Sequence, residues 1–289
     1  MKKRSVGVWG RGNWIDTSRR VEACELAAEI EELGYESLWL TAGFDDGVPS
    51  VFGDLLDATN HLTVASGILS IWHSSATQTS VAFNSLDQKH PGRFLLGLGA
   101  SHGPIVEASD QIYRRPYSRM VDYLDELEKQ QPGVPTENLI LAALGPRMLQ
   151  LAAERASGAH PYFVPVEYTA LARETMGEQA QLIPEQGVVL ETDPQLARII
   201  ARDHMKKYLE LPNYTNNLNR LGFDDEEIKN GGSDRLVDAI VAWGDAEAIV
   251  ERVDSQIAAG ASSVCVQVLN GDSSEFPRSQ YRDLAAALF

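Results

Sequence analysis

Short apolar runs with strand character alternate with amphipathic helical patterns from one end of the 289-residue chain to the other. This alternation is typical of β-α-β units, which build a parallel sheet covered by helices. Glycine or proline marks several boundaries between the patterns, as at Gly34 and at Pro91-Gly92. The predicted strands lie at 5–9, 37–41, 62–71, 94–98, 138–143, 159–164, 187–190 and 263–268.

A strand–helix alternation repeated eight times predicts one closed (β/α)8 TIM barrel of the α/β class. A barrel of this kind typically needs about 250 residues, so the chain has room for additional structure. A helical stretch at about 212–242 interrupts the alternation before the last strand–helix pair, and we interpret it as an insertion. Because no Pro/Gly/Ser-rich linker divides the chain, we expect a single domain over residues 1–289.

The charge balance limits the partners of the chain. The net charge is −16, which repels phosphate backbones and anionic lipid headgroups, so we expect neither nucleic acid nor a membrane surface as a partner. The chain shows no signal-peptide pattern and no apolar run long enough to span a bilayer. Its two cysteines, Cys24 and Cys265, are too few for a disulfide scaffold. We therefore expect a cytoplasmic protein that acts on a small molecule.

The active site of such a barrel lies at the C-terminal ends of the strands, so the residues that follow each apolar run are the candidates. Trp9 ends the first strand, Trp72 and His73 follow the third, and His102 follows the fourth. These positions are rich in aromatic residues and glycine and poor in charge. We interpret Trp9, Trp72 and His73 as walls of a substrate pocket.

The segment 142–147, Ala-Ala-Leu-Gly-Pro-Arg, predicts a site for an anion. An apolar strand that leads directly into Gly145-Pro146 and a helix leaves free backbone N–H groups at the positive end of the helix dipole. Arg147 in the first helical turn opposes this dipole, and a bound phosphate or carboxylate would explain it. A tight turn with a surface arginine is the open alternative. Gly158 would let the backbone approach the same anion, or is a turn glycine.

Two further positions are candidates for contact with a ligand. Gly67 interrupts the third strand, which indicates a bulge, a close approach by a ligand, or a glycine required by barrel packing. Histidine side chains in general titrate near neutrality, so His102 is the best candidate for a proton donor or a cofactor contact, with an ordinary loop histidine as the alternative. The run at 97–102 lacks the dinucleotide-binding fingerprint.

Other chemistries have no matching pattern. The histidines form no metal-binding motif, so we expect no metal. No lysine lies at a predicted strand end, and no Gly-x-Ser-x-Gly motif is present, which disfavours Schiff-base and serine-hydrolase chemistry. Aromatic and glycine residues beside an anion site fit a flat, phosphorylated organic cofactor.

Several segments resemble the bacterial luciferase-like superfamily and, more narrowly, its probable deazaflavin (coenzyme F-420)-dependent oxidoreductases. The Pro-Gly-Arg-Phe-x-Leu-Gly-x-Gly run that begins at Pro91 is the most specific of them. These segments are spread along the chain, so the resemblance extends over nearly its whole length. They lie at 62–69, 91–102, 143–149, 156–161, 212–218, 232–238 and 264–269.

The resemblance implies a (β/α)8 barrel that binds coenzyme F-420 or FMN at its C-terminal mouth, with hydride transfer at position 5 of the ring. It implies a cis peptide between Gly67 and Ile68 that forms a bulge under the ring, and contact of Ser70 with the ring or ribityl chain. His102 lies where deazaflavin-dependent relatives have an acidic proton donor. The resemblance also implies a homodimer. The residues that correspond to the phosphate-binding turn and its surroundings are Leu144, Gly145, Pro146, Arg147, Gly158 and Ala159.

The chain departs from the family pattern after the second strand. Relatives often carry a polar pair there, whereas this chain has Ala42-Gly43. Our prediction is an oxidoreductase that transfers a hydride between a reduced flavin-type cofactor and a small organic substrate, or that uses reduced FMN and oxygen for monooxygenation. The alternatives are a non-catalytic or vestigial flavin-binding barrel and a barrel enzyme without a redox cofactor, such as an isomerase.

Overall fold

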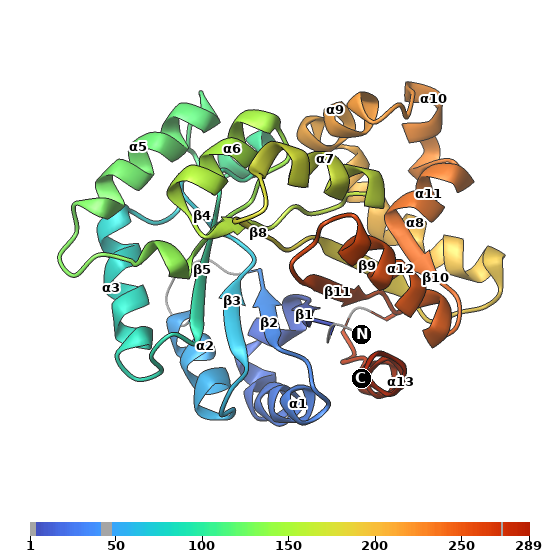
Figure 1. The fold of residues 1–289 in the computed structure, drawn as a ribbon, viewed down its shortest axis with the longest axis horizontal. Coiled ribbons are helices and arrows are strands. Elements are labelled where there is room, and N and C mark those ends of the chain that lie inside the picture. The colour runs from blue at the N-terminus through green and yellow to red at the C-terminus, as the bar shows by residue number, and fades with distance from the viewer. Residues whose placement is uncertain (1–3, 42–47, 273) are drawn as a thin grey trace.

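The computed structural model describes residues 4–41, 48–272 and 274–289. Helices surround a curled sheet of parallel strands (Figure 1). The strands are Val6–Gly10 (β1), Ser37–Leu40 (β2), Thr63–Ser66 (β3), Leu69–Ser70 (β4), Phe94–Gly99 (β5), Leu139–Leu141 (β6), Gly158–Ala159 (β7), Gln181–Leu182 (β8), Glu185–Val189 (β9), Val241–Trp243 (β10) and Val264–Val268 (β11).

The α-helices alternate with these strands over most of the chain, as the sequence pattern predicts. They are Arg20–Glu32 (α1), Val48–Asp57 (α2), Ala76–Asp87 (α3), Gly103–Glu107 (α4), Pro116–Glu128 (α5), Pro146–Arg155 (α6), Val166–Met176 (α7), Pro194–Leu209 (α8), Pro212–Arg220 (α9), Asp225–Ile228 (α10), Asp234–Ile240 (α11), Ala246–Ala258 (α12) and Arg278–Leu288 (α13).

The sheet follows the order β10-β9-β11-β1-β2-β3-β5-β6-β7-β8, and β4 pairs with β5. Only Ile183 and Pro184 separate β8 from β9. The Ile183 and Glu185 N–H groups donate to the carbonyls of Ala159 and Pro161, each at 2.9 Å, so the pairing with the β7 segment continues through this break. Residues 181–189 thus pair with β7 through β8 and with β10 and β11 through β9, which connects the two ends of the strand order. The predicted α/β class and parallel sheet are confirmed, and the sheet is curled.

Three predicted strands differ from the structure. The third is divided into β3 and β4 by Gly67 and Ile68, which are joined by a cis peptide bond. The sixth is only Gly158–Ala159, because Pro161 has no N–H for a ladder. The seventh begins at Gln181 rather than 187. In addition, β10 is a short strand that the pattern does not predict.

The side chains of the strands divide into two layers. Those on the outer side, such as Val8, Leu40 and Phe94, pack under the helices in the main core. A smaller group faces the interior of the curled sheet and includes Trp9 and Trp39, which are register partners on β1 and β2. The aromatic interior fills the space beneath the C-terminal ends of the strands.

Residues 212–240 form α9, α10, a 3-10 turn and α11 before the chain returns to the sheet at β10. These helices and α8 pack around a second hydrophobic core that contains Met205, Tyr214 and Leu218. They lie together on one side of the molecule, at the right in Figure 1. This arrangement places α9 within contact distance of the loop that follows β5, as described below.

Within the described part of the chain, no helix is both long and apolar enough to cross a membrane.

Candidate functional site

The C-terminal ends of β4 and β5 lie side by side. Ser70 is the register partner of Gly99, and the Trp72 indole N–H donates to the Ala100 carbonyl at 2.8 Å. Ser70 is buried and Trp72 is half-buried. The structure therefore brings two of the predicted site residues next to the loop that carries His102.

The cis peptide at Gly67-Ile68 connects β3 and β4, and its residues approach Trp9 on β1 and Gly99 on β5. A Cβ atom at Gly67 would be 3.1 Å from Nε1 of Trp9, a buried atom without a hydrogen-bond partner. A Cβ atom at Gly99 would be 2.5 Å from Cδ1 of Ile68, so the Ile68 side chain occupies the space that this glycine leaves. Gly67, Ile68 and Trp9 thus form a close-packed and largely apolar surface, which suits one face of a flat ring.

The turn that leads into α6 has the geometry of an anion site. The Tyr168 hydroxyl donates to the carbonyls of Ala143 and Leu144 at 3.0 and 3.1 Å, which fixes the turn. The N-cap residue Gly145 provides no side-chain acceptor to the first helical N–H groups, and no atom lies within 4 Å of a Cβ placed there. The Arg147 guanidinium lies 4.0 Å from the ring centroid of Tyr117 and is exposed.

Gly158 and Ala159 have packing roles in this structure. A Cβ atom at Gly158 would lie 1.9 Å from the backbone oxygen of Gln181, so the close approach of β7 and β8 requires glycine. The Ala159 side chain is fully buried in the main core. These contacts account for both residue types without reference to a ligand.

His102 is half-buried and precedes α4 as its N-cap residue. Its Nδ1 lies 3.0 Å from Oδ1 of Asn213 on α9. Because an amide oxygen only accepts, Nδ1 is the donor and Nε2 carries the lone pair of the neutral ring. Burial lowers the pKa of His102, and the Asn213 hydrogen bond opposes this effect. His102 is therefore held as a neutral, oriented imidazole near pH 7.

His73 does not join Trp72 and His102 in the site. It is exposed, and its Nε2 lies 3.0 Å from Oγ of Ser109, in the segment that follows α4. The Trp72 ring is 5.6 Å from the ring of Tyr113, and the Tyr113 hydroxyl donates to the Ser101 carbonyl at 3.4 Å. This segment thus covers the end of β5.

A hydrogen-bonded chain near the mouth was not predicted from the sequence. Tyr162 donates to Oε1 of Gln267 at 2.8 Å, and its oxygen is then free to accept from Tyr208, also at 2.8 Å. His204 is 3.4 Å from the Tyr162 hydroxyl, and burial lowers its pKa to about 3. The Trp9 ring is 5.4 Å from that of Tyr162. Tyr162 lies within the predicted strand at 159–164, but no sequence signal indicates that α8 brings His204 and Tyr208 to it.

Two buried ionisable side chains face the interior of the sheet. Burial raises the pKa of Glu185 to about 8, although its Oε2 accepts an N–H bond from Phe163 at 3.2 Å. Burial lowers the pKa of His160 to about 4, although its Nδ1 bonds to the Ile183 carbonyl at 2.7 Å. Oε1 of Glu185 and Nε2 of His160 are buried without a partner. Both side chains are therefore neutral near pH 7.

Among the described residues, no three or more His, Cys, Asp or Glu side chains come together as a metal site would require. Ala42-Gly43, where the sequence departs from the family pattern, lies outside the described residues.

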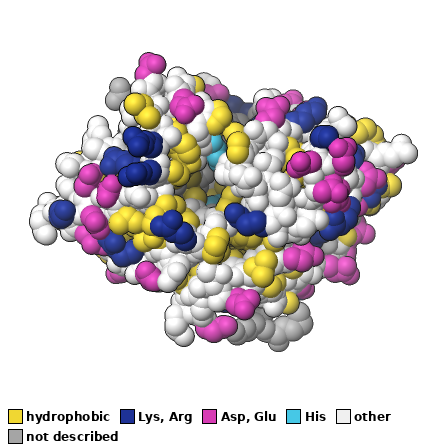
Figure 2. Space-filling model, turned by 90° about the horizontal axis from the view of Figure 1, so that it is seen from above, with side chains coloured by type: hydrophobic (Ala, Val, Ile, Leu, Met, Phe, Trp, Pro, Cys, Tyr) yellow, Lys and Arg dark blue, Asp and Glu magenta, His cyan; other side chains and the backbone are white. Residues whose placement is uncertain are grey.

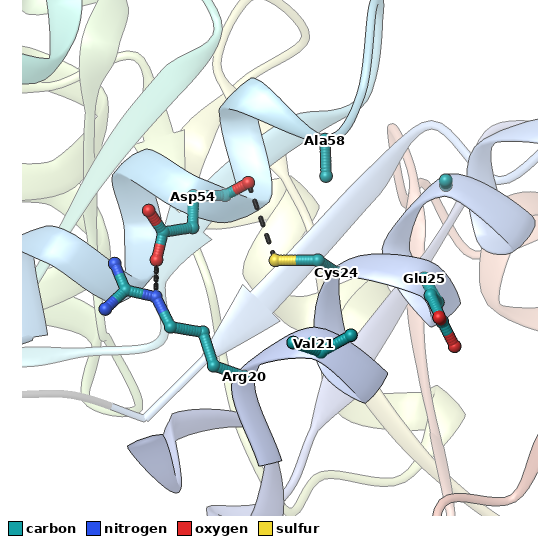
Figure 3. A pocket seen from close by; sticks show the side chains of 7 residues that line it. Arg20, Val21, Cys24, Glu25, Asp54 and Ala58 are labelled. Atoms are coloured by element: carbon teal, nitrogen blue, oxygen red, sulfur yellow. Dashed lines mark hydrogen bonds and ion pairs between the residues drawn. The ribbon is translucent and has the colours of Figure 1, made fainter. Parts of the chain in front are cut away.

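A surface groove of about 530 Å³ lies between α1 and α2, away from these residues (Figure 3). Arg20 forms an ion pair with Asp54 across it, and the Cys24 thiol donates weakly to the Asp54 carbonyl at 3.7 Å. The face that carries α5, α6 and α9 is also hollowed at its centre, and a histidine side chain is visible inside the hollow (Figure 2). Lysine and arginine side chains lie on both sides of this hollow.

The luciferase-like monooxygenase family model matches residues 8–263. A 5,10-methylenetetrahydromethanopterin reductase of Archaeoglobus fulgidus is 24% identical over an alignment of 149 residues, and the match covers 44% of this chain and 45% of that relative. The match to this curated relative thus spans less than half of its length.

Solved structures of the same fold cover nearly the entire chain. The coenzyme F420-dependent tetrahydromethanopterin reductase from Methanopyrus kandleri has a TM-score of 0.72 at 15% identity and covers 98% of this chain and 97% of that one. The oxygenating constituent of 3,6-diketocamphane monooxygenase of Pseudomonas putida, in complex with FMN, has a TM-score of 0.68 at 12% identity and covers 98% and 96%.

Proposed function

The chain belongs to the luciferase-like monooxygenase family, and we propose that it is an oxidoreductase that uses coenzyme F-420 or FMN to transfer a hydride to or from a small organic substrate. The observation that carries the proposal is the free N-terminus of α6 with Arg147. It lies at the same end of the sheet as the apolar surface of Gly67, Ile68 and Trp9. A phosphate and a flat ring are the two parts that such a cofactor presents.

The N-terminus of α6 would hold the phosphate. Backbone N–H groups at a helix start and the positive end of its dipole attract an anion, and Arg147 adds a full positive charge. Leu144 and Gly145 shape the turn, and Pro146 begins the helix without an N–H of its own. The space beside Gly145 fits this role, since a Cβ atom there has no neighbour within 4 Å. Gly158 and Ala159 would support the turn from the neighbouring strand.

The apolar surface would hold the ring. Gly67 and Ile68 would support one face, Ser70 would contact the ring or its polyol chain, and the unpartnered Nε1 of Trp9 offers a donor close to Gly67. The bound cofactor supplies the hydride chemistry. Trp9 and Trp72 would form walls of the substrate pocket, with His73 at its outer margin.

His102 would exchange a proton with the substrate. Its Nδ1 is bonded to Asn213, which leaves the Nε2 lone pair available. A neutral imidazole takes a proton from an alcohol as the alcohol is oxidised, and the protonated ring returns it when a carbonyl is reduced. We therefore assign proton transfer at Nε2 to His102.

Four finer points belong to the same proposal. We propose that residues 1–289 form one domain and that residues 212–242 are an insertion, since their helices pack with α8 around a second core beside the main one. We also propose a homodimer and a cytoplasmic location; neither cysteine is in a disulfide, which fits a reducing compartment.

Titration of the purified protein with FMN and with coenzyme F-420, followed by fluorescence, tests the proposal. We expect one of the two to bind in the micromolar range or more tightly, and Arg147→Ala to weaken it about tenfold with unchanged thermal unfolding. Arg155→Gln, at the other end of α6, is the matched control and should bind normally. Absence of binding by both cofactors would reject the proposal, and binding without turnover of any substrate would favour the vestigial alternative.

A further inference from the structure

Two positively charged side chains lie at one sector of the mouth, formed by β1, β11 and β9. Arg11 directly follows β1, and its Nη1 bonds to Oδ1 of Asn270, just beyond β11, at 3.2 Å. Lys207 belongs to the last turn of α8, the helix that follows β9. Tyr208, the next residue of α8, bonds to Tyr162, which bonds to Gln267 on β11, so Lys207 lies near the end of β11 that Arg11 also reaches.

Neither charge is neutralised by the described part of the chain. Arg11 has only the Asn270 amide, and Lys207 lies 4.7 Å from the centroid of the Tyr208 ring. The adjacent Lys206, by contrast, pairs with Asp203 at 3.2 Å. The chain has 41 acidic residues and only 25 basic ones, so most of its cations have an acidic partner available. Two cations without such a partner in one sector of the mouth therefore need an explanation.

The two charges also act on each other. Desolvation lowers the pKa of the Lys207 ammonium, and the positive charge of Arg11 lowers it further. The same two cations contribute, after burial, to the low pKa of His204. Like charges that lie close together destabilise a protein unless an anion lies between them or beside them.

Among the described residues, the three ionisable groups beneath this sector, Tyr162, Tyr208 and Glu185, carry no negative charge at neutral pH. Burial raises the pKa values of Tyr162 and Tyr208, and that of Glu185 to about 8, so all three are protonated. Tyr208 donates to Tyr162, which donates to Gln267, so the Tyr208 oxygen remains an acceptor. The aromatic rings of Trp9 and Tyr162 provide an apolar wall next to these polar groups.

The sector lies far round the sheet from the turn that would hold the cofactor phosphate. That turn follows β6, and the strand order from β1 to it is β1-β2-β3-β5-β6. In a curled sheet, strands so far apart in the order lie across the mouth from each other. Two separate anion sites on opposite sides of the mouth suit two different molecules, the cofactor and the substrate.

We propose that Arg11 and Lys207 bind the carboxylate of an acidic organic substrate and direct its apolar part toward Trp9 and Tyr162. This inference rests on the proposed function, since it names the substrate class of the same mouth. A carboxylate between a guanidinium and an ammonium gains charge-assisted hydrogen bonds from both. It also removes the repulsion between the two cations.

The test uses the full chain without cofactor and two probes of equal shape, phenylacetate and the neutral phenylacetamide, with affinities measured by ligand-observed NMR. We expect the wild type to prefer phenylacetate at least tenfold, and the R11Q/K207Q double variant to lose the preference. K206Q is the matched control and should keep it, and Arg11→Lys, which retains the charge, should keep part of it. Equal binding of the two probes by the wild type, or an unchanged preference in the double variant, overturns the proposal.

A cofactor titration of the same variants separates the two proposals. If the double variant binds FMN or coenzyme F-420 as the wild type does, the anion site belongs to the substrate, as we propose. If its cofactor affinity falls as much as its phenylacetate affinity, the cations serve the cofactor and the substrate proposal is wrong. If the wild type prefers phenylacetate but binds neither cofactor, the proposed function fails while the carboxylate site stands. Circular dichroism of each variant verifies that it is folded.

Discussion

The imidazole of His160 lies against the indole of Trp39, with 4.4 Å between the ring centroids and 15° between their planes. Trp39 is fully buried and His160 nearly so. The stack is part of the interior of the curled sheet, directly beneath the candidate site. A charged imidazole at this position would have no water around it, and its Nε2 has no partner.

We predict that this stack makes the fold sensitive to acid. The pKa of His160 is about 4 in the folded protein, against about 6.5 in an unfolded chain. The unfolded state therefore takes up a proton first, so stability is intact above about pH 6.5 and falls as the pH drops from 6.5 toward 4. The loss is on the order of 3 kcal/mol. Urea unfolding of the wild type and of His160→Gln at pH 7 and pH 5 measures it, and the difference between the two pH values should be smaller in the variant. An equal pH dependence of both proteins would contradict the prediction.

Glu185 has the opposite pH dependence. Its folded pKa of about 8 exceeds the value of about 4.3 for an unfolded glutamate. Deprotonation of the unfolded state therefore reduces stability as the pH rises from about 4.3 toward 8, by about 4 kcal/mol at pH 7. We predict that Glu185→Gln, which keeps an acceptor for the Phe163 N–H, raises the melting temperature at pH 7 but not at pH 4.5. Calorimetry at both pH values tests this, with the exposed Glu210→Gln as control. An equal effect at both pH values would show that packing, not the proton, is responsible.

Two glycines of the predicted phosphate region should respond differently to alanine. A methyl group at Gly158 would lie 1.9 Å from the Gln181 carbonyl oxygen, so Gly158→Ala should separate β7 from β8. We expect the free energy of unfolding to fall by about 1–3 kcal/mol or more. Gly145 has backbone angles that alanine accepts (φ −86°, ψ 151°) and open space at its Cβ. Gly145→Ala should therefore fold normally and weaken cofactor binding by filling that space. Thermal unfolding and a cofactor titration of both variants test the contrast; a destabilised Gly145→Ala protein would contradict it.

The regular elements of the fold were predictable where local patterns suffice. The predicted strands at 37–41 and 94–98 correspond to β2 and β5 within one residue. The start of β9 was missed because Glu185 and Gln186 are polar. The structure shows why they are buried there: the Gln186 amide donates to the carbonyls of Gly187 and Ile240 and accepts from Gln256. A hydrophobic pattern contains no information about such long-range partners.

The same distinction applies to the candidate site. The strand-end rule identified Trp9, Trp72 and His102, and the structure places Trp72 beside the loop that carries His102. It did not identify Tyr208 or Asn213, because these belong to helices whose amphipathic pattern shows which face is buried but not what that face covers. Helices α8 and α9 reach the mouth through contacts between residues more than 40 positions apart.

Asn213 therefore provides the last prediction, as the positioning residue for His102. Its side-chain oxygen accepts from Nδ1 at 3.0 Å and raises the histidine pKa against the larger effect of burial. Asn213→Ala should thus lower the pKa of His102 further, moving the acid limb of the pH–rate profile to lower pH, while His102→Gln should slow turnover about 100-fold at every pH. NMR titration of the His102 ring in the cofactor-free protein gives a readout independent of turnover. Asn216→Ala, an exposed change on the same helix, should leave the titration unchanged. A histidine pKa that rises in Asn213→Ala would show that the hydrogen bond favours the neutral ring, and would remove Asn213 from this role.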